Sequence, residues 1–318
     1  LDPELAAWPG LPPAVDLIHP GYNLLTEAWW DMADEPLRIV QDTAQALGLP
    51  LLSLEIELGP SQVEAVFEAA DALTAADNMV LFRGAVKQAL RRAGYHATFI
   101  CRPPFPNIMS SGWHLHQSLT DIGSGANAFR RDAPAEGSSA LDAQHTLSAI
   151  GEHYLAGLLQ HGRAMAVCCS PTVNGFARFQ PNALAPQSVL WGRDNRGAAF
   201  RVIGSCGDGD TRIENRIGDP SANPYLYLAA QVYAGLDGIR QALKAPPATD
   251  SPYATRHARL PGGLEEALAA LEEDATLGDG LGDDFIRYFA RIKRFELARY
   301  EAAEDKTDFQ RREYFSRF

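Results

Sequence analysis

The segment Trp113–Leu119 constrains the fold of this chain more than any other. Its residues alternate strictly, with His114, His116 and Ser118 on one side and mostly apolar residues between them. A period of two is typical of a β-strand that buries one face and keeps the other polar. The sequence therefore predicts a sheet whose polar face carries two histidines and a hydroxyl group.

A second segment has the same period. Arg212, Glu214 and Arg216 alternate with residues that include Ile213, and Ile217 follows on the apolar side. Such a strand can carry a ladder of surface ion pairs. It can equally hold an inward cationic pair beside a carboxylate, which would bind a phosphate and a metal ion together. The segment by itself leaves both interpretations open.

The rest of the chain combines hairpin-like strands with separate helices. The spacing of apolar residues predicts helices over 35–47, 142–160, 222–243, 264–275 and 284–304, and a further helix that starts at Thr74 and stops at Gly94. Strands are predicted over 51–58, over 96–102 and at several places between 164 and 217. Because strands and helices do not alternate regularly, the predicted fold class is α+β. Residues 1–34 are expected to be an irregular N-terminal segment ahead of one domain over 35–318.

Composition and charge exclude several classes of protein. The 318 residues include 28 basic and 40 acidic ones, so the formal net charge is −12. A chain this acidic repels nucleic acid, although a small local anion site is compatible with it. No apolar stretch is long enough to span a membrane, and no secretory leader is recognisable at the start. The four cysteines lack a CxxC spacing, which favours reduced thiols in a cytoplasmic protein.

Acidic residues gather around a predicted turn. Glu55 and Glu57 share one face of a strand, and the turn at Gly59-Pro60 can bring Glu64 back beside them. Carboxylates gathered in this way suit Mg²⁺ or Mn²⁺. Solvated charges on a sheet edge would explain them equally well. The paired histidines of the first strand favour a metal or phosphate site more strongly.

Four arginines, Arg178, Arg193, Arg196 and Arg201, lie close together in a stretch rich in glycine and asparagine. Against the negative net charge they indicate a local anion site, since the planar guanidinium suits carboxylates and phosphoryl oxygens. Together with the carboxylates and histidines they describe a site for divalent cations, a phosphorylated ligand and a carboxylate substrate. This combination is what phosphoryl transfer needs. P-loop, dinucleotide-binding and esterase motifs do not occur in the sequence.

The stretches "SSGWHLHQSL", "SPTVNGFARFQP" and "TRIENRIGDPSANPYLYLAAQVYAGLDGI" resemble the catalytic domain of the glutamine synthetase superfamily. They follow one another in the family's order, and the resemblance runs from about residue 35 to the end. The H-x-H-x-S strand followed by R-I-E-x-R-x-x-D-P-S-A-N-P-Y is highly specific. The resemblance implies a curved, mainly antiparallel sheet with helices packed outside.

The resemblance also implies an ATP-dependent ligase, which phosphorylates the γ-carboxylate of glutamate and lets an amine displace the phosphate. It implies two metal ions, Mg²⁺ or Mn²⁺, held by the pair Glu57 and Glu64 and by the pair His114 and Glu214. The residues that it assigns to ATP are His116, Ser118, Arg201 and Arg212, and those assigned to glutamate and the transferring phosphoryl group are Arg178, Arg196 and Arg216. The family builds its sites between subunits of stacked rings, so a homo-oligomer is expected.

Three departures from the family pattern bear on function. The early E-x-E strand and the β-rich domain that carries it are not found before residue 35, so an upstream part is expected to be missing from this sequence, which starts at Leu1. The family's Asn-Gly is Met109-Ser110, and the glutamate beside the ammonium site is Leu184.

Without that carboxylate an ammonium ion lacks an anionic partner and a base. We therefore expect Leu184 and Met109 to line an apolar pocket for an amine other than ammonia. A glutamine synthetase that uses ammonia is the alternative within the same enzyme class. A catalytically inactive family member with a structural or regulatory role is the alternative from another class.

Overall fold

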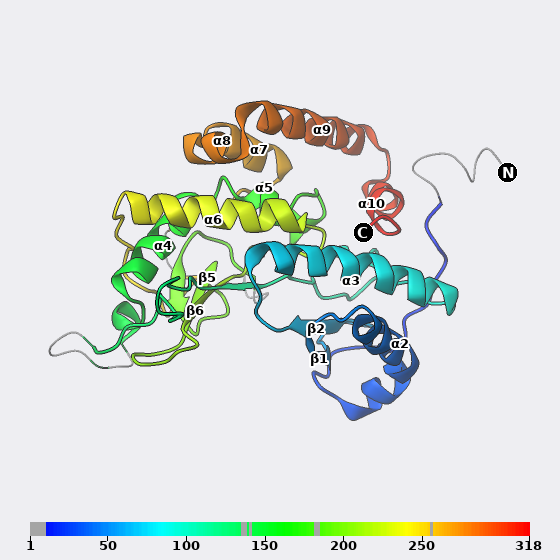
Figure 1. The fold of residues 1–318 in the computed structure, drawn as a ribbon. Helices are drawn as coiled ribbons and strands as arrows, with labels where there is room; N and C mark the ends of the chain where they lie inside the picture. The colour runs from blue at the N-terminus through cyan, green and yellow to red at the C-terminus, as the bar shows by residue number, and fades with distance from the viewer. Residues whose placement is uncertain (1–10, 135–138, 140–141, 181–184, 255–256) are drawn as a thin grey trace. The chain divides into compact units, whose positions relative to one another are not determined.

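The computed structural model describes residues 11–134, 139, 142–180, 185–254 and 257–318 (Figure 1). The chain divides into two compact units. The first comprises the residues up to Ser111 together with Tyr300–Phe318, and the second comprises Gly112–Arg299. Each unit has a sheet of its own, a two-stranded one in the first and a four-stranded one in the second.

The first unit packs long helices against a β-hairpin. Its elements are α2 (Glu27–Ala46), β1 (Leu51–Ile56), β2 (Val63–Phe67), α3 (Ala72–Arg92) and α10 (Lys306–Tyr314). Val40 and Ala44 of α2 meet Phe82, Val86 and Leu90 of α3 in a shared apolar core. The core-facing residues recur every three or four positions, as the helical pattern of the sequence predicts.

Helix α2 begins at Glu27, well before the predicted start at residue 35, and this part of the prediction was wrong. The helix continues through Pro36, which is buried. A proline inside a helix removes its own N–H and leaves the carbonyl four residues earlier without a donor. That residue is Met32, which is 53% exposed, so this turn of the helix faces water.

Helix α3 begins at Ala72 rather than at Thr74. Asp71 is the N-cap, and its side chain accepts a hydrogen bond of 3.1 Å from the Thr74 N–H. An aspartate there satisfies a free N–H group and complements the helix dipole. The predicted stop is confirmed, since Gly94 follows the helix with a φ of +88°. Glycine adopts this left-handed conformation without strain.

The predicted strand over 96–102 is wrong, because within the described part of the chain this segment forms no strand. The side chains of Ala97 and Phe99 pack against the core of the first unit, as does that of Tyr95 just before the segment. The residues between them contact backbone carbonyls near the end of the chain. His96 Nε2 lies 3.0 Å from the Phe315 oxygen, and Thr98 Oγ1 donates to the Phe318 oxygen at 3.1 Å. The side chains of this segment alternate in their contacts, but among the described residues it pairs with no other strand.

The second unit contains a mainly antiparallel sheet. Its strands are β3 (Leu115–Gln117), β4 (Trp191–Arg193), β5 (Phe200–Ile203) and β6 (Arg212–Asn215), and they lie in the order β3-β6-β5-β4. β6 pairs antiparallel with β3 and with β5, whereas β4 and β5 are parallel. The strand predicted over Trp113–Leu119 is confirmed, although only its central residues, Leu115–Gln117, form a ladder.

The helices of the second unit are α4 (Ala149–Gln160), α5 (Ala166–Cys169), α6 (Pro224–Arg240), α7 (Leu264–Glu272), α8 (Ala275–Leu281) and α9 (Asp283–Ala302), with short 3₁₀ turns η1 (Ala143–His145) and η2 (Gly175–Arg178). The predicted helices over 222–243, 264–275 and 284–304 are confirmed to within a few residues. The β-like stretch between 164 and 217 also contains α5 and η2, which the sequence analysis did not predict.

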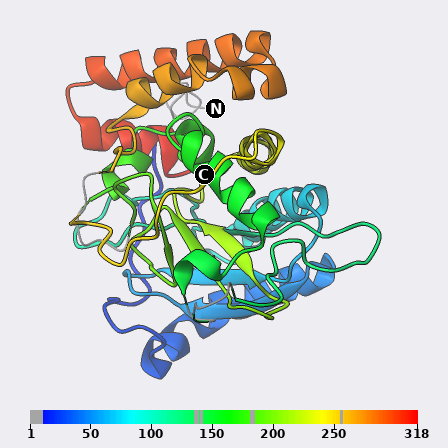
Figure 2. The same ribbon diagram turned by 90° about the vertical axis from the view of Figure 1, so that its left-hand side faces the viewer.

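Helices α4 and α6 lie against one face of this sheet (Figure 1 and Figure 2). Gln231 of α6 accepts hydrogen bonds from Gln117 of β3 at 3.2 Å and from Asn215 of β6 at 2.8 Å. Tyr154 of α4 donates to the same Gln117 at 2.6 Å. Since neighbouring residues of a strand face opposite ways, His116 and Glu214 lie on the face away from these helices.

Helices α7, α8 and α9 lie side by side in both views (Figure 1 and Figure 2). Arg294 links α9 to α7 through ion pairs of 2.9 Å to Glu265 and 2.7 Å to Glu272. All four cysteines have free thiols. Within the described ranges, every helix is too short or too polar to cross a membrane.

Candidate active site

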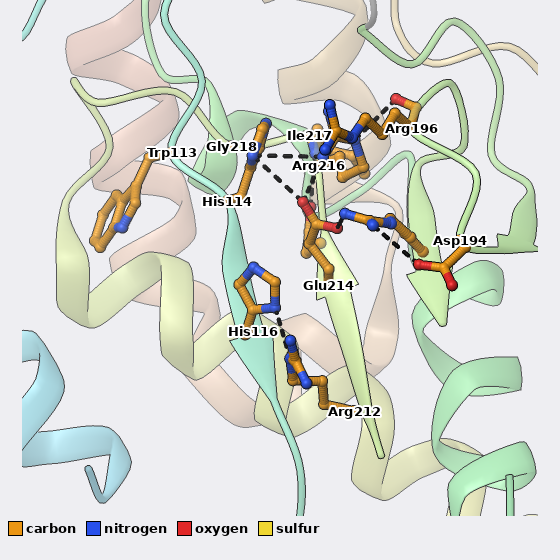
Figure 3. A network of polar contacts seen from close by, with 12 residues as sticks. Trp113, His114, His116, Asp194, Arg196, Arg212, Glu214, Arg216, Ile217 and Gly218 are labelled. Carbon is orange, nitrogen blue, oxygen red and sulfur yellow. Dashed lines mark hydrogen bonds and ion pairs between the residues drawn. The ribbon is translucent and has the colours of Figure 1, made fainter. Parts of the chain in front are cut away.

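Glu214 is the centre of a polar cluster on the face of the four-stranded sheet opposite α4 and α6 (Figure 3). Its carboxylate is buried, with only 1% of the residue exposed. One oxygen accepts from Arg201 at 3.0 Å, and the other accepts from Arg216 and lies 3.3 Å from His114 Nδ1. A buried carboxylate is stable only when such charges and donors surround it. The geometry of β6 therefore agrees with an inward carboxylate between arginines, which is the second of the two interpretations given for this strand.

Strand pairing brings these residues together. His116 lies directly opposite Glu214 across β3 and β6, and Arg201 lies directly opposite Glu214 across β5 and β6. His114 lies just before β3, and the adjacent Trp113 N–H donates to the Gly218 carbonyl at 2.9 Å. Three separate stretches of sequence thus contribute to one face of a small sheet.

His114 is a neutral imidazole in this environment. Burial lowers its pKa well below the ordinary value of 6.5, and the charges of Arg216 and Arg178 lower it further. Arg178 Nη2 lies 3.5 Å from its Nε2, and Arg216 Nη1 lies 3.4 Å from its Nδ1. A neutral imidazole keeps a lone pair, which is the form that binds metal ions.

His116 and Arg212 form the outer edge of the cluster. Arg212 Nε donates to His116 Nδ1 at 3.1 Å, and Arg212 Nη1 donates to the Asp210 carbonyl at 3.0 Å. Burial lowers the pKa of His116, although the nearby Glu214 charge opposes this shift. Ser118 is exposed just beyond the end of β3. These side chains offer donors towards solvent, where a large anion can reach them.

The predicted arginines differ in their surroundings. Arg178 is buried and donates to the carbonyls of Arg216 at 2.9 Å, of Ile217 at 3.1 Å and of Gly218 at 3.2 Å. Arg216 is buried too, and its Nε donates to the Arg196 carbonyl at 2.9 Å. The side chain of Arg196 is exposed. Arg178 thus holds the loop after β6, whereas Arg196 can reach a ligand.

The acidic residues of the first unit share one face of its hairpin. Glu55 and Glu64 are direct cross-strand partners, and the Glu57 N–H donates to the Gln62 carbonyl at 3.0 Å. In this register Glu57 lies diagonally across from Glu64 on the face that also carries Glu55. The expectation that the turn returns Glu64 towards the other two glutamates is confirmed.

The donor types suit divalent cations. Among the described residues there is no group of three or more His, Cys, Asp or Glu side chains arranged to hold a metal ion. The pairs Glu57 with Glu64 and His114 with Glu214 each offer two donors. Mg²⁺ usually takes one or two carboxylates and completes its shell with water and substrate phosphates. The residues present therefore fit such an ion, provided that a phosphorylated ligand supplies further oxygens.

The structure describes only one of the two residues expected to line an amine pocket. Leu184 lies outside the described residues. Met109 lies against the hairpin turn of the first unit, because a Cβ placed on Gly59 would come within 3.1 Å of the Met109 Cβ.

Sequence reasoning missed one residue beside the Glu214 cluster of the second unit and one beside the acidic hairpin of the first unit. Asp194 pairs with Arg201 at 2.9 Å and has a φ of +50°. Tyr22 has a φ of +62°, its N–H donates to the Leu58 carbonyl at 2.7 Å, and its hydroxyl donates to the Asn107 carbonyl. Left-handed backbone at residues other than glycine often marks functional sites. The sequence contains a hint only for Asp194, since aspartate tolerates this conformation better than most residues.

Comparison with known proteins agrees with the geometry of both units. The family model for the glutamine synthetase catalytic domain matches residues 24–312, and the chain therefore belongs to this family. It is 42% identical to a protein named gamma-glutamylanilide synthase from Acinetobacter sp, a match that covers 99% of this chain and 64% of that protein. It is 36% identical to the glutamine synthetase of Thermus thermophilus, with 88% of this chain and 62% of that protein covered.

A solved structure described as apo GmaS without ligand has the same fold. It matches with a TM-score of 0.77 at 30% identity, and the match covers 93% of this chain and 66% of that one. The expected α+β fold of a glutamine synthetase-like catalytic domain is thereby confirmed. The chain spans less than two thirds of the length of these relatives.

Proposed function

We propose that this protein is an ATP-dependent ligase that joins the γ-carboxylate of glutamate to an amine other than ammonia. The observation that carries the proposal is the cluster around Glu214, in which a carboxylate and a neutral imidazole stand beside Arg201, Arg216 and Arg178. Several fixed positive charges at one place neutralise a phosphoryl group that moves between two anions. The 42% identity to a protein named gamma-glutamylanilide synthase supports the choice of amine.

In this proposal the polar face of the four-stranded sheet binds the nucleotide. His116, Ser118, Arg201 and Arg212 contact ATP, and the two guanidinium groups bind its phosphate oxygens with paired N–H donors. Strand positions support this assignment, since β3, β5 and β6 present His116, Arg201 and Arg212 on one face.

Arg196 and Arg216 hold the carboxylates of glutamate and the transferring phosphoryl group. The buried Arg178 adds its positive charge to the site. An oxygen of the γ-carboxylate attacks the terminal phosphorus of ATP, the bond to ADP breaks, and γ-glutamyl phosphate forms. Fixed guanidinium groups favour this step because they balance the charge that builds up on the oxygens around phosphorus.

The amine then attacks the γ-carbonyl carbon. The bond to phosphate breaks, phosphate leaves, and the nitrogen loses a proton to give the γ-glutamyl amide. Leu184 and Met109 supply apolar surface for the hydrocarbon part of the amine. An arylamine is largely unprotonated at neutral pH, so it needs no anionic partner in the pocket.

Glu57 and Glu64 are proposed to hold one Mg²⁺ or Mn²⁺, and His114 and Glu214 the other. When bound, these ions polarise phosphoryl oxygens and neutralise their charge. The protein's own contribution is to fix the carboxylates by strand pairing and to keep His114 unprotonated.

The test measures ADP release by the full-length protein with Mg²⁺, ATP and glutamate across a panel of amines. Aniline, an alkylamine, ethanolamine and ammonia should be compared, with the amide product identified by mass spectrometry. The proposal expects the highest kcat/KM with an apolar amine. Equal or better use of ammonia would make the protein a glutamine synthetase, for which the 36% identity to the Thermus enzyme is an argument. Absence of ADP release with every amine of the panel would favour the inactive family member.

We also propose a homo-oligomer of stacked rings in the cytoplasm. Exposed aromatic side chains on α9 support a further protein contact, since Tyr288 is 66% and Phe295 64% exposed. Large apolar side chains grouped on one helix face often mark such contacts. Sedimentation of the full-length protein at micromolar concentration tests this, and a monomer would contradict it.

A further inference from the structure

We propose that Asp194 is a positioning residue that holds the guanidinium of Arg201 in the orientation required by the nucleotide phosphates. The inference rests on the proposed function, because it takes Arg201 to contact ATP. It assigns a role to a side chain that neither the sequence motifs nor the metal-binding pairs include.

Arg201 is held at both terminal nitrogens of its guanidinium. Its Nη1 donates to Glu214 Oε2 at 3.0 Å, and its Nη2 donates to Asp194 Oδ1 at 2.9 Å. One partner alone would let the planar group pivot about a single hydrogen bond. Two carboxylates at opposite ends fix the plane of the group as well as its position.

Another donor of the Arg201 guanidinium lacks a partner in the part of the chain that the structure describes, which indicates that the side chain is not placed to satisfy all of its own N–H groups. Its Nε is buried and has no hydrogen-bond acceptor among the described residues. A buried donor without an acceptor is unfavourable. The two terminal ion pairs must therefore hold the side chain where it lies.

Asp194 is itself held in an unusual conformation. Its φ of +50° is uncommon for a residue other than glycine. Its N–H donates to the Val202 carbonyl at 3.0 Å, which ties the end of β4 to β5. The next residue, Asn195, accepts from the Gly197 N–H at 3.0 Å and donates to the Thr249 carbonyl at 3.2 Å. Surroundings that impose a strained backbone are common where a side chain must be placed accurately.

The two partners of Arg201 differ in a way that separates their roles. The Glu214 side chain is 2% exposed and is shared with Arg216 and His114, whereas the Asp194 side chain is 60% exposed. Glu214 therefore fixes the inner end of the guanidinium and belongs to the reaction centre. Asp194 fixes the end that faces solvent, and it can be changed without opening the core.

The experiment uses the full-length protein and compares Asp194→Ala with Asp194→Asn. A fluorescent ADP analogue reports nucleotide affinity without turnover, and steady-state kinetics report KM for ATP and kcat. A hydrogen bond of this kind contributes about 1 kcal/mol, which corresponds to about fivefold. Asp194→Ala should therefore weaken nucleotide binding and raise KM for ATP about threefold to fivefold. We expect kcat and KM for the amine to stay within about twofold of wild type.

The asparagine variant separates position from charge, because it keeps a hydrogen-bond acceptor for Arg201 and removes the negative charge. It should bind nucleotide within about twofold of wild type. In an Arg201→Gln background, Asp194→Ala should have no further effect, since Asp194 acts through Arg201. Asp250→Ala removes another exposed aspartate of the same unit and should leave nucleotide affinity unchanged.

Unchanged or tighter nucleotide binding by Asp194→Ala overturns the inference. A loss in Asp194→Asn as large as in Asp194→Ala also overturns it, because charge and not position would then matter. If the wild-type protein binds no nucleotide, the proposed function fails and this inference fails with it. Nucleotide binding by wild type together with a failed Asp194 test overturns this inference alone.

Discussion

Arg201 of β5 lies directly opposite Glu214 of β6, and the two side chains form an ion pair of 3.0 Å across the strands. The pair joins a residue assigned to the nucleotide with one assigned to a metal ion. Both strands are short, and their backs are fully buried through Val202 and Ile213. The polar face that carries Arg201 and Glu214 is therefore supported by a packed apolar layer.

Removal of the Glu214 charge should abolish turnover. Glu214→Gln keeps the size of the side chain, but its single carbonyl oxygen can accept from only one of the two arginines and offers a metal ion a neutral ligand. We expect kcat/KM to fall at least about hundredfold, as is typical for loss of a preorganised charged group. Calorimetry with Mn²⁺ should show weaker binding, while the circular dichroism spectrum stays that of wild type. Glu273→Gln, at an exposed position of the same unit, should change neither. Unchanged turnover at limiting Mg²⁺ would remove Glu214 from the metal site.

Leu184 should govern the choice of amine. About six or seven buried carbons remove on the order of 150 Å² from water, which is worth about 3–4 kcal/mol at 25 cal/mol per Å². This corresponds to more than about a hundredfold in kcat/KM for an apolar over a charged amine. Leu184→Glu should shift the preference towards ammonia or charged amines in competition assays. Leu73→Glu, at a leucine that is 64% exposed on α3, is the control. An unmoved selectivity profile would contradict this role.

His161 should make the stability of the second unit depend on pH. Its Nδ1 lies 2.6 Å from Asp274 and its Nε2 lies 3.1 Å from Asp237. Burial lowers its pKa, but the hydrogen bonds and charges of Asp274 and Asp237 outweigh burial, so the pKa is raised above 6.5. A raised pKa means that the folded state holds the proton more tightly than the unfolded state. The stabilisation is therefore complete below the unfolded value and is lost as pH rises through the folded value.

Urea unfolding of wild type and His161→Gln between pH 5.5 and 9 tests this. The variant should lose about 3 kcal/mol at the acidic end, the contribution of one or two charge-assisted hydrogen bonds. The difference between the two proteins should shrink as pH rises. A difference that grows with pH would reverse the assigned sign.

Two glycines set the approach of α4 and α6. A Cβ on Gly157 would collide with the Ala234 carbonyl, and a Cβ on Gly238 would collide with the His153 carbonyl. Gly157→Ala should destabilise the protein by about 2–3 kcal/mol, because overpacking forces two backbones apart. On α3, a Cβ at Gly84 would meet nothing within 4 Å. Gly84→Ala should stabilise by about 0.5–1 kcal/mol through helix propensity. Equal shifts in the unfolding midpoints of the two variants would contradict this account.

The local patterns of the sequence predict well which residues share a face. The alternation from Trp113 to Leu119 and from Arg212 to Ile217 places the polar residues of both strands on one side, and the structure has them there. The same reasoning correctly groups Glu55, Glu57 and Glu64 on one face of a hairpin. These predictions hold because the direction of a side chain within a strand depends only on its neighbours along the chain.

Prediction fails where distant segments decide the outcome. The pattern over 96–102 is that of a strand, but contacts with Phe315 and Phe318 replace a partner ladder. Helix α2 includes Pro36 because the core around Val40 and Ala44 outweighs the missing hydrogen bond. In both cases packing energy from remote residues overrides a local preference.

The sequence by itself determined the family through its motifs, and the α+β class through the spacing of its apolar residues. It also supplied the residue types that suit divalent cations, a phosphorylated ligand and a carboxylate, because residue type and spacing are properties of the chain alone. Only the tertiary structure decided that Glu214 lies between Arg201, Arg216 and His114, and that Asp194 holds the outer end of Arg201. Ion pairs of this kind depend on sheet register and on a left-handed backbone at one turn. Such geometry follows from the packing of the whole unit, and no local pattern of residues encodes it.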